Sequence, residues 1–147
     1  EHEWLVAFLT NHPMIDFLHL HMEDYTSLEQ IRIASKCHVL IGVHGNGLSH
    51  VLWMQPERYV VEIYWQFPFQ FDYMTASQLM RHNYMALFNG KAIDQELIRT
   101  RAKSLRQMPK KVVVTKQNIT KIRDEVEEGR RALMGFLQKA MIELGVR

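Results

Sequence analysis

Hydrophobic residues recur along the first part of the chain with the periods of short helices and strands. Their spacing predicts the end of a helix over residues 1–9 and, by alternation with polar residues, a short strand over 15–21. The sequence Ser-Leu-Glu-Gln at 27–30 is a capping box and predicts that a second helix begins there. Unbroken apolar and β-branched runs at 38–43 and 59–64 predict strands that are buried on both faces.

The later pattern predicts further alternation of helices and strands. Helices are expected near 72–81 and over 93–106, and strands near 84–88 and over 112–114. Strands that alternate with helices are typical of βαβ units, which form parallel sheets. The chain is therefore predicted to have an α/β fold with a parallel sheet flanked by helices.

The last predicted helix, 118–144, has an apolar face that would dock on the sheet. Its apolar residues are Ile119, Ile122, Val126, Leu133, Leu137, Ala140 and Leu144. A coiled coil is the alternative interpretation, but Gly129 and Gly135 interrupt the seam that it would need.

The composition fits a single folded domain over residues 1–147. The chain has 147 residues, of which 47% are hydrophobic, which excludes a disordered protein and supports a sizeable core. No apolar run reaches the roughly 18 residues of a membrane span, so we expect no membrane contact by this segment. The single cysteine, Cys37, excludes an internal disulfide. Because the first residue is Glu1 rather than Met, we interpret the chain as part of a longer protein.

Charge divides the chain into two parts. Residues 1–90 carry four basic and nine acidic side chains, whereas residues 91–147 carry fourteen and seven. The first part is the predicted βαβ core, and the second is predicted to be a basic, helical C-terminal part. Residues 91–135 contain no aromatic residue, so the basic charge is not interpreted as a nucleic-acid surface.

The sequence His-Gly-Asn-Gly-Leu-Ser at 44–49, between a predicted strand and a predicted short helix at 48–54, carries the clearest chemistry. A sharp turn into a helix exposes backbone N–H groups at the positive end of the helix dipole, which suits a phosphate or diphosphate. Glycine allows an anion to approach the backbone closely. The predicted anion-binding residues are His44, Gly45, Asn46, Gly47, Leu48 and Ser49. The alternative is that the glycines serve only a tight turn.

Glu62 follows near the end of the next predicted strand. In βαβ nucleotide sites, an acidic residue at this position accepts hydrogen bonds from ribose hydroxyls. A surface carboxylate without this role is the alternative, and the preceding glycine-rich turn favours the ribose contact.

Other catalytic motifs fail on spacing. A G-x-G-x-x-G dinucleotide motif would need glycine where His50 stands, and Ser49 has the wrong offset for a G-x-S-x-G elbow. Cys37 and His38 are adjacent on a predicted strand, so their side chains point to opposite faces and do not form a nucleophile–base pair.

Residues 39–54, followed by Pro56 and Val-Val-Glu-Ile at 60–63, resemble glycosyltransferase family 61. The family includes the EGF-domain O-GlcNAc transferase, plant xylan-decorating enzymes and many fungal members. Its typical motif is H-G-A-G-L-T-H, in which Asn46 here replaces Ala and Ser49 replaces Thr. The resemblance is specific over about 27–64, and the basic tail carries no motif of the family.

The resemblance implies the C-terminal, donor-binding half of a GT-B glycosyltransferase, with a Rossmann-like sheet, whose N-terminal partner half is absent from this chain. It also implies an inverting reaction without a metal or other cofactor, and the sequence contains no D-x-D motif. The expected donor is a nucleoside-diphosphate sugar, with UDP as the nucleotide. His44, at the carboxyl end of its strand, is the candidate catalytic residue, which would donate to the leaving diphosphate.

Three other features have two interpretations each. The aromatic stretch 64–73 could line the donor or acceptor site, or seal the edge of the sheet. His19, His21 and His44 could converge on zinc, although isolated surface histidines are the simpler interpretation. Asn118 begins an N-glycosylation sequon, which could instead cap the last helix.

We therefore predict a glycosyltransferase fragment, inactive alone, that transfers a sugar to a hydroxyl of a glycan or glycoprotein. By resemblance, the enzyme is expected in the lumen of the Golgi or endoplasmic reticulum. The first alternative is a non-catalytic nucleotide- or phosphate-binding Rossmann-like module or pseudoenzyme. The second is an interaction domain that uses the aromatic stretch and the basic helix.

Overall fold

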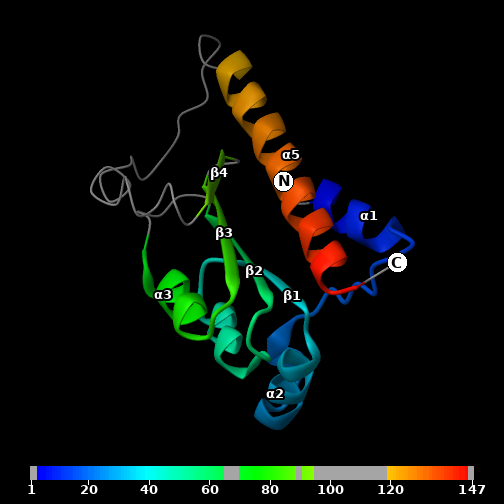
Figure 1. Ribbon diagram of the computed structural model, residues 1–147, viewed down its shortest axis with the longest axis vertical. Coiled ribbons are helices and arrows are strands. Elements are labelled where there is room, and N and C mark those ends of the chain that lie inside the picture. Colours follow the sequence, from blue (N-terminus) through cyan, green and yellow to red (C-terminus); the bar gives the residue numbers. More distant parts are fainter. Residues whose placement is uncertain (1–2, 65–69, 89–90, 95–118, 146–147) are drawn as a thin grey trace.

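A computed structural model describes residues 3–64, 70–88, 91–94 and 119–145, and a four-stranded sheet lies at its centre (Figure 1). The strands lie side by side in chain order: β1 (Val39–Val43), β2 (Tyr59–Tyr64), β3 (Asn83–Phe88) and β4 (Lys91–Asp94). The first three strands are parallel, and β4 pairs with β3 in the antiparallel direction. The predicted α/β class is confirmed, and the sheet is compatible with a Rossmann-like fold.

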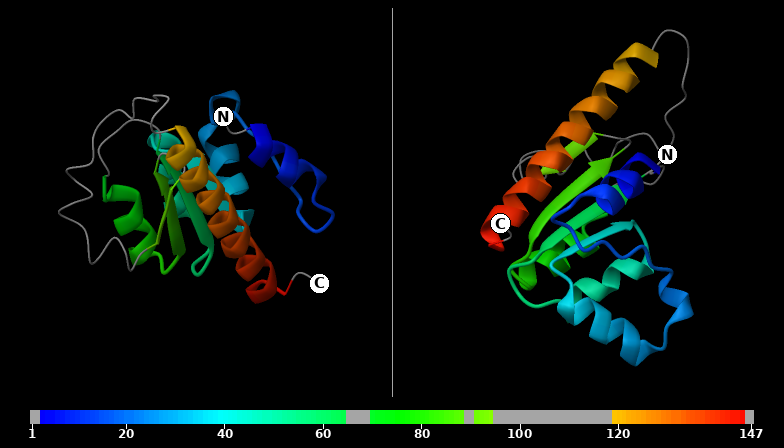
Figure 2. Two further views of the ribbon diagram at one scale, coloured as in Figure 1. Left: turned by 90° about the horizontal axis from the view of Figure 1, so that it is seen from above. Right: turned by 90° about the vertical axis from the view of Figure 1, so that its right-hand side faces the viewer.

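Helices cover both faces of this sheet (Figure 2). The helical elements are α1 (Glu3–Asn11), η1 (Met22–Asp24), α2 (Ser27–Lys36), η2 (Asn46–Trp53), α3 (Asp72–Leu79) and α5 (Ile119–Glu143), of which η1 and η2 are 3-10 helices. α1 and α5 lie on one face, whereas η2 and α3 lie on the other and α2 packs against η2.

The strands supply one core to each face because successive side chains of a strand point in opposite directions. In β2, Val60 and Tyr64 pack under η2 and α3, whereas Val61 and Ile63 pack under α1 and α5. All six residues of β2 are buried, as the unbroken apolar pattern predicts. Glu62 lies between Val60 and Tyr64 and therefore shares their face.

α5 docks on the sheet through one face of the helix. Leu133 and Leu137 are buried against Val61, Ile63 and neighbours on β3, which confirms the predicted docking helix. The end of α5 is attached to the start of β2, because the Tyr59 hydroxyl donates to the Glu143 carboxylate and the Tyr59 ring meets Phe136 edge-on at 5.3 Å between centroids.

Two predicted elements are wrong. Residues 15–21 alternate in polarity but form no strand, because no described strand pairs with them; Ile15 and Phe17 instead pack on the core beneath α1 and α5. Ile93, at the start of a predicted helix, lies on β4, where its pairing with Ala86 buries it. The rest of that predicted helix, the predicted strand 112–114 and the sequon at Asn118 lie outside the described residues.

The capping box of α2 begins one residue earlier than predicted. The Thr26 side chain accepts from the Glu29 amide, and the Glu29 carboxylate accepts from the Thr26 amide at 2.9 Å. Both Thr-x-x-Glu at 26–29 and Ser-x-x-Gln at 27–30 satisfy the motif, and the structure uses the pair with the carboxylate, which binds backbone N–H groups more strongly than an amide does.

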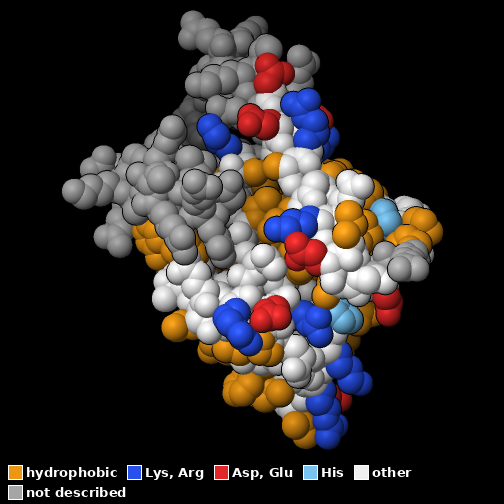
Figure 3. Space-filling model, viewed as in Figure 1, with side chains coloured by type: hydrophobic (Ala, Val, Ile, Leu, Met, Phe, Trp, Pro, Cys, Tyr) orange, Lys and Arg blue, Asp and Glu red, His pale blue; other side chains and the backbone are white. Residues whose placement is uncertain are grey.

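The surface carries mixed charge on the face shown in Figure 3, where basic side chains lie among acidic ones over the described part of the chain. Within the described residues, no helix combines the length and apolar character needed to cross a membrane.

Candidate functional site

The carboxyl end of β1 leads directly into residues 44–49, the glycine turn, which contains the predicted anion-binding residues. The His44 amide donates to the Ile63 carbonyl at 2.8 Å, so the parallel pairing with β2 continues into the first residue of the turn. Open α/β sheets bind ligands beyond the carboxyl ends of their strands. The turn therefore lies at the edge of the sheet where a ligand is expected.

Glu62 fixes the side chain of His44. The His44 Nδ1 lies 2.5 Å from the Glu62 Oε1, and the Glu62 side chain is 0% exposed while that of His44 is 12% exposed. Gly42 and Ala86 flank Glu62 on the neighbouring strands. Because these two residues are small, they leave room for a carboxylate and its partners on this face of the sheet.

Tyr84 binds the second oxygen of the same carboxylate. Its hydroxyl donates to the Glu62 Oε2 at 2.5 Å. Burial, and then the negative charge of Glu62, raise the pKa of Tyr84, so the hydroxyl stays protonated and donates. Since a carboxylate can only accept, the His44 Nδ1 must carry a proton as well. Glu62 thus selects the tautomer of His44 and fixes the orientation of the ring.

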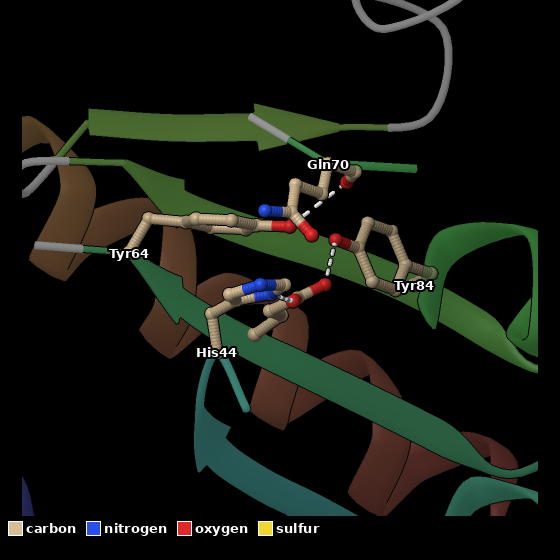
Figure 4. Close-up of polar contacts among 5 residues, drawn as sticks. His44, Tyr64, Gln70 and Tyr84 are labelled. Carbon is tan, nitrogen blue, oxygen red and sulfur yellow. Dashed lines mark hydrogen bonds and ion pairs between the residues drawn. The ribbon is translucent and has the colours of Figure 1, made fainter. Parts of the chain in front are cut away.

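Two further tyrosines pack against the His44 ring. Tyr64 stacks on it at 4.7 Å between centroids, and Tyr73 meets it edge-on at 5.6 Å. The Tyr64 hydroxyl donates to the Gln70 carbonyl at 2.9 Å, and Figure 4 shows His44, Tyr64 and Tyr84 converging over the sheet. Burial raises the pKa of both Tyr64 and Tyr73, so both remain neutral. The described part of the aromatic stretch 64–73 therefore encloses His44.

The glycine turn is open on its outer side. Gly45 has φ +155°, which L-residues with a Cβ rarely adopt, so the turn requires glycine there. A Cβ at Gly47 would meet no atom within 4 Å, and Asn46 and Ser49 are exposed as well. The turn therefore offers backbone to a ligand at positions 46 and 47.

Two predicted site residues contribute differently from what the sequence indicates. The Leu48 side chain is 1% exposed and its amide donates to the Gly45 carbonyl at 2.9 Å, so Leu48 supports the turn from inside. The Ser49 hydroxyl donates to the Asn46 carbonyl at 2.7 Å and is committed to the backbone of its own helix.

The predicted ribose contact of Glu62 is not supported by this geometry. A ribose hydroxyl cannot reach a side chain with no exposed surface, and both carboxylate oxygens already accept from His44 and Tyr84. The physical reason lies in the register, because Glu62 points with Val60 and Tyr64 into the core rather than toward the strand end.

The sequence interpretation missed Tyr84 and the position of Tyr64. The signal available in the sequence was a carboxylate within an apolar strand. A buried charge requires hydrogen-bond donors, and buried tyrosines on the same or the adjacent strand are the nearest donors. The weakness of this signal is that register decides which tyrosine comes within reach of Glu62, and register is not visible in a single sequence. Tyr84 pairs with Val60, two residues before Glu62.

The structure does not assemble the three histidines considered for zinc. The His19 ring contacts Phe17 and His21, whereas the His44 Nδ1 contacts Glu62. Within the part of the chain that the structure describes, no three His, Cys, Asp or Glu side chains are placed to hold a metal ion. The Cys37 thiol has a pKa raised by burial and donates to the Val39 carbonyl at 2.9 Å, so it is a poor nucleophile.

Comparison with known families bears on this site directly. Residues 1–61 match the model of the family described as Glycosyltransferase 61. This part of the chain is therefore similar to glycosyltransferase family 61. A comparison with curated proteins found no match, and a comparison with solved structures found none either.

The predicted resemblance to glycosyltransferase family 61 is therefore confirmed over residues 1–61, and the match supports glycosyl transfer as the activity at the level of the family. The matched residues include β1, the whole glycine turn and η2, and they end within β2. Nucleotide-sugar donors and glycan acceptors are general to this family of transferases.

Proposed function

We propose that this chain is the donor-binding part of an inverting glycosyltransferase that uses a nucleoside-diphosphate sugar, with UDP as the nucleotide. The acceptor would be a hydroxyl of a glycan or glycoprotein. Support comes from the family match over the glycine turn and from the position of that turn at the carboxyl end of a parallel strand. The observation that carries the proposal is the His44 ring, held by the buried Glu62 at the first residue of the turn.

In this proposal, His44 stabilises the leaving diphosphate. The acceptor oxygen attacks the anomeric carbon while the bond from that carbon to the phosphate oxygen breaks, and negative charge grows on the diphosphate. His44 would donate to it through Nε2, because Nδ1 is bound to Glu62. A ring that donates through both nitrogens is a cation, and the Glu62 carboxylate is the counter-charge that such a cation needs in a buried site.

The backbone of the glycine turn would bind the same diphosphate. The Leu48 amide makes the first hydrogen bond of η2. The amides of Asn46 and Gly47 come before it and therefore correspond to the unpaired N–H groups at a helix start. Since a Cβ at Gly47 would project into open space, Gly47→Val should leave the fold intact. It should abolish binding of UDP in calorimetry, and unchanged affinity would remove the turn from the site.

The main test is His44→Ala in the protein at its full natural length. Charge that develops as the bond breaks affects kcat more than KM. We expect kcat to fall by roughly 10²–10³, the scale for loss of one preorganised donor. If His44 only packs beneath the turn, the variant would lose stability and keep near-normal turnover per folded molecule.

Metal independence is part of the proposal and has its own test. EDTA should leave the activity of the wild type unchanged. Activity destroyed by EDTA and restored by a divalent ion would contradict it.

The remaining parts of the proposal concern the cellular setting. We propose that this chain is inactive alone because the acceptor-binding half of a GT-B enzyme must complete the cleft. We also propose that the enzyme works in the lumen of the Golgi or endoplasmic reticulum, where glycoprotein acceptors are modified. Expression of the chain alone and with its upstream sequence, followed by a transfer assay, tests the first statement.

A non-catalytic nucleotide-binding module is the second candidate, and the enclosed position of His44 is the observation that favours it. Packing against Tyr64 and Tyr73 leaves the His44 side chain only 12% exposed. Titration separates the candidates. The transferase prefers UDP or a UDP-sugar, a generic module does not discriminate among nucleotides, and a pure interaction domain binds none.

A further inference from the structure

The glycine turn is held on its inner side by three successive carbonyl groups. Each accepts a hydrogen bond from the residue three positions later: Gly45 from the Leu48 amide at 2.9 Å, Asn46 from the Ser49 hydroxyl at 2.7 Å, and Gly47 through His50 Nδ1 at 2.7 Å. In a trans peptide the N–H points away from the C=O of the same unit. The contacts of the Gly45 and Asn46 carbonyls therefore direct the amides of Asn46 and Gly47 toward the opposite, outer side. The contact of the Gly47 carbonyl fixes the Leu48 amide, which is the donor to Gly45.

The His50 contact extends from the turn to α2. The His50 Nε2 lies 2.9 Å from the Gln30 Oε1, and His50 is only 9% exposed. The Gln30 Nε2 donates to the Met22 carbonyl at 2.7 Å and to the Tyr25 carbonyl at 2.9 Å. Because carbonyls only accept, these two contacts fix the amide with its oxygen toward His50. Both ring nitrogens of His50 therefore face acceptor oxygens.

At Asn46 and Gly47, hydrogen bonds rather than side-chain packing must hold the turn in place. A Cβ at Gly47 would meet no atom within 4 Å, and Asn46 and Gly47 are exposed, so no side chain covers them from outside. The turn would otherwise be free to rotate its peptide units, since glycine accepts many backbone conformations.

We propose that Gln30 and His50 are positioning residues for donor binding: by holding the Gly47 carbonyl they fix the Leu48 amide on the Gly45 carbonyl, so that the Asn46 amide faces the diphosphate. The proposal rests on the proposed function of the turn. It adds that α2, which is not part of the glycine turn, sets the geometry of the phosphate site through the Gln30–His50 link.

The test uses two variants that each retain half of the link, in the protein at its full natural length. An asparagine amide nitrogen replaces Nδ1 of histidine, and a glutamine amide nitrogen replaces Nε2. His50→Asn therefore keeps the contact with Gly47, and His50→Gln keeps the contact with Gln30. We expect each variant to bind UDP about tenfold more weakly, the effect of one lost hydrogen bond, with unchanged affinity for uridine, which has no phosphate.

Gln30→Met breaks the link at its other end and should produce the same selective loss. His82→Asn is the matched control, because His82 is also buried and this variant loses the contact of Nε2 with the Val51 carbonyl of η2, at 3.0 Å. This control should lower the melting temperature and leave the ratio of UDP to uridine affinity at its wild-type value.

The outcomes separate the two proposals. If the wild type binds UDP and the three variants bind it equally well, the link has no positioning role and the proposed function stands. A parallel loss of UDP and uridine binding in the folded variants would also overturn the link, because it indicates general damage. If the wild type binds no nucleoside diphosphate, the proposed function itself fails.

Discussion

The two faces of the sheet are both covered by helices but are filled with different chemistry. Under α1 and α5 the core is apolar, with Leu5, Leu9, Val61, Ile63, Met85, Leu87, Leu133 and Leu137. The buried polar and charged side chains of the described residues all belong to the face under η2 and α3, and they are His50, Glu62, Ser77 and His82. The same β2 strand serves both faces.

This difference separates what holds the domain together from what shapes the site. Apolar packing depends on volume and tolerates swaps that conserve it. A buried hydrogen-bond network depends on direction, because each group left without a partner costs the full desolvation of that group. Changes on the two faces should therefore affect different measurements.

The largest expected effect on stability comes from the apolar face. Leu133 is fully buried between α5 and the sheet, and Leu133→Ala should lower the free energy of unfolding by about 2–5 kcal/mol through lost burial and a residual cavity. Urea unfolding measures it. The affinity of the folded variant for UDP should stay at the wild-type value, and a specific loss of affinity would contradict the division between the faces.

Glu62→Gln tests the network on the other face. A glutamine has one acceptor oxygen, so it cannot accept from both His44 and Tyr84, and the His44 tautomer is no longer fixed. We expect a cost of about 1–3 kcal/mol in the transition state, which lowers kcat about 5- to 150-fold. Affinity for the ribose should not change. The check compares the affinity for UDP with that for a nucleotide that lacks the ribose hydroxyls. If the ratio of the two affinities is smaller in the variant than in the wild type, Glu62 contacts the ribose directly.

Tyr84→Phe removes one donor and leaves the other. The Glu62 carboxylate keeps His44, so the expected loss of stability is about 1.5 kcal/mol, the lower end for a hydrogen bond to a charged group. The melting temperature measures it. A fall in kcat as large as that of Glu62→Gln would mean that Tyr84, not Glu62, controls the His44 ring.

The smallest effect is expected at the capping box that begins α2. Thr26→Ala should destabilise the protein by about 1 kcal/mol at neutral pH. The hydrogen bonds from Thr26 lower the pKa of Glu29, so their contribution is present above the usual pKa of a glutamate and is lost as the pH falls through the lowered value. The free energy of unfolding of the variant should therefore fall less steeply with decreasing pH than that of the wild type. An equal dependence on pH in the two proteins would exclude a contribution of Glu29 through Thr26.

Elements with one dominant periodic signal could be predicted from the sequence. β2 begins and ends as predicted, and α5 has the predicted apolar face, since Leu133, Leu137 and Ala140 are buried. Residues 15–21 show why alternation alone is insufficient. Alternation assigns faces, but a strand also needs a partner strand for its backbone hydrogen bonds, and none of the described strands supplies one.

The candidate site could be located from the sequence but not assembled from it. The glycine turn was visible because its residue types are unusual, and its position after β1 follows from the strand pattern. The contacts of Glu62 with Tyr84, and of His50 with Gln30, join residues 22 and 20 positions apart. Such contacts depend on register and on helix packing, which a periodic pattern does not contain.

Gly42 limits the order in which this site can change during evolution. An added Cβ at Gly42 would lie 3.0 Å from the Leu48 Cδ2, and Leu48 is too buried to move aside. Gly42→Ala alone should therefore strain the packing of Leu48 at the start of η2. After a substitution such as Leu48→Ala the same change would be tolerated, which is sign epistasis between neighbouring positions. A lineage would then enlarge residue 42 more readily after it had reduced residue 48 than before.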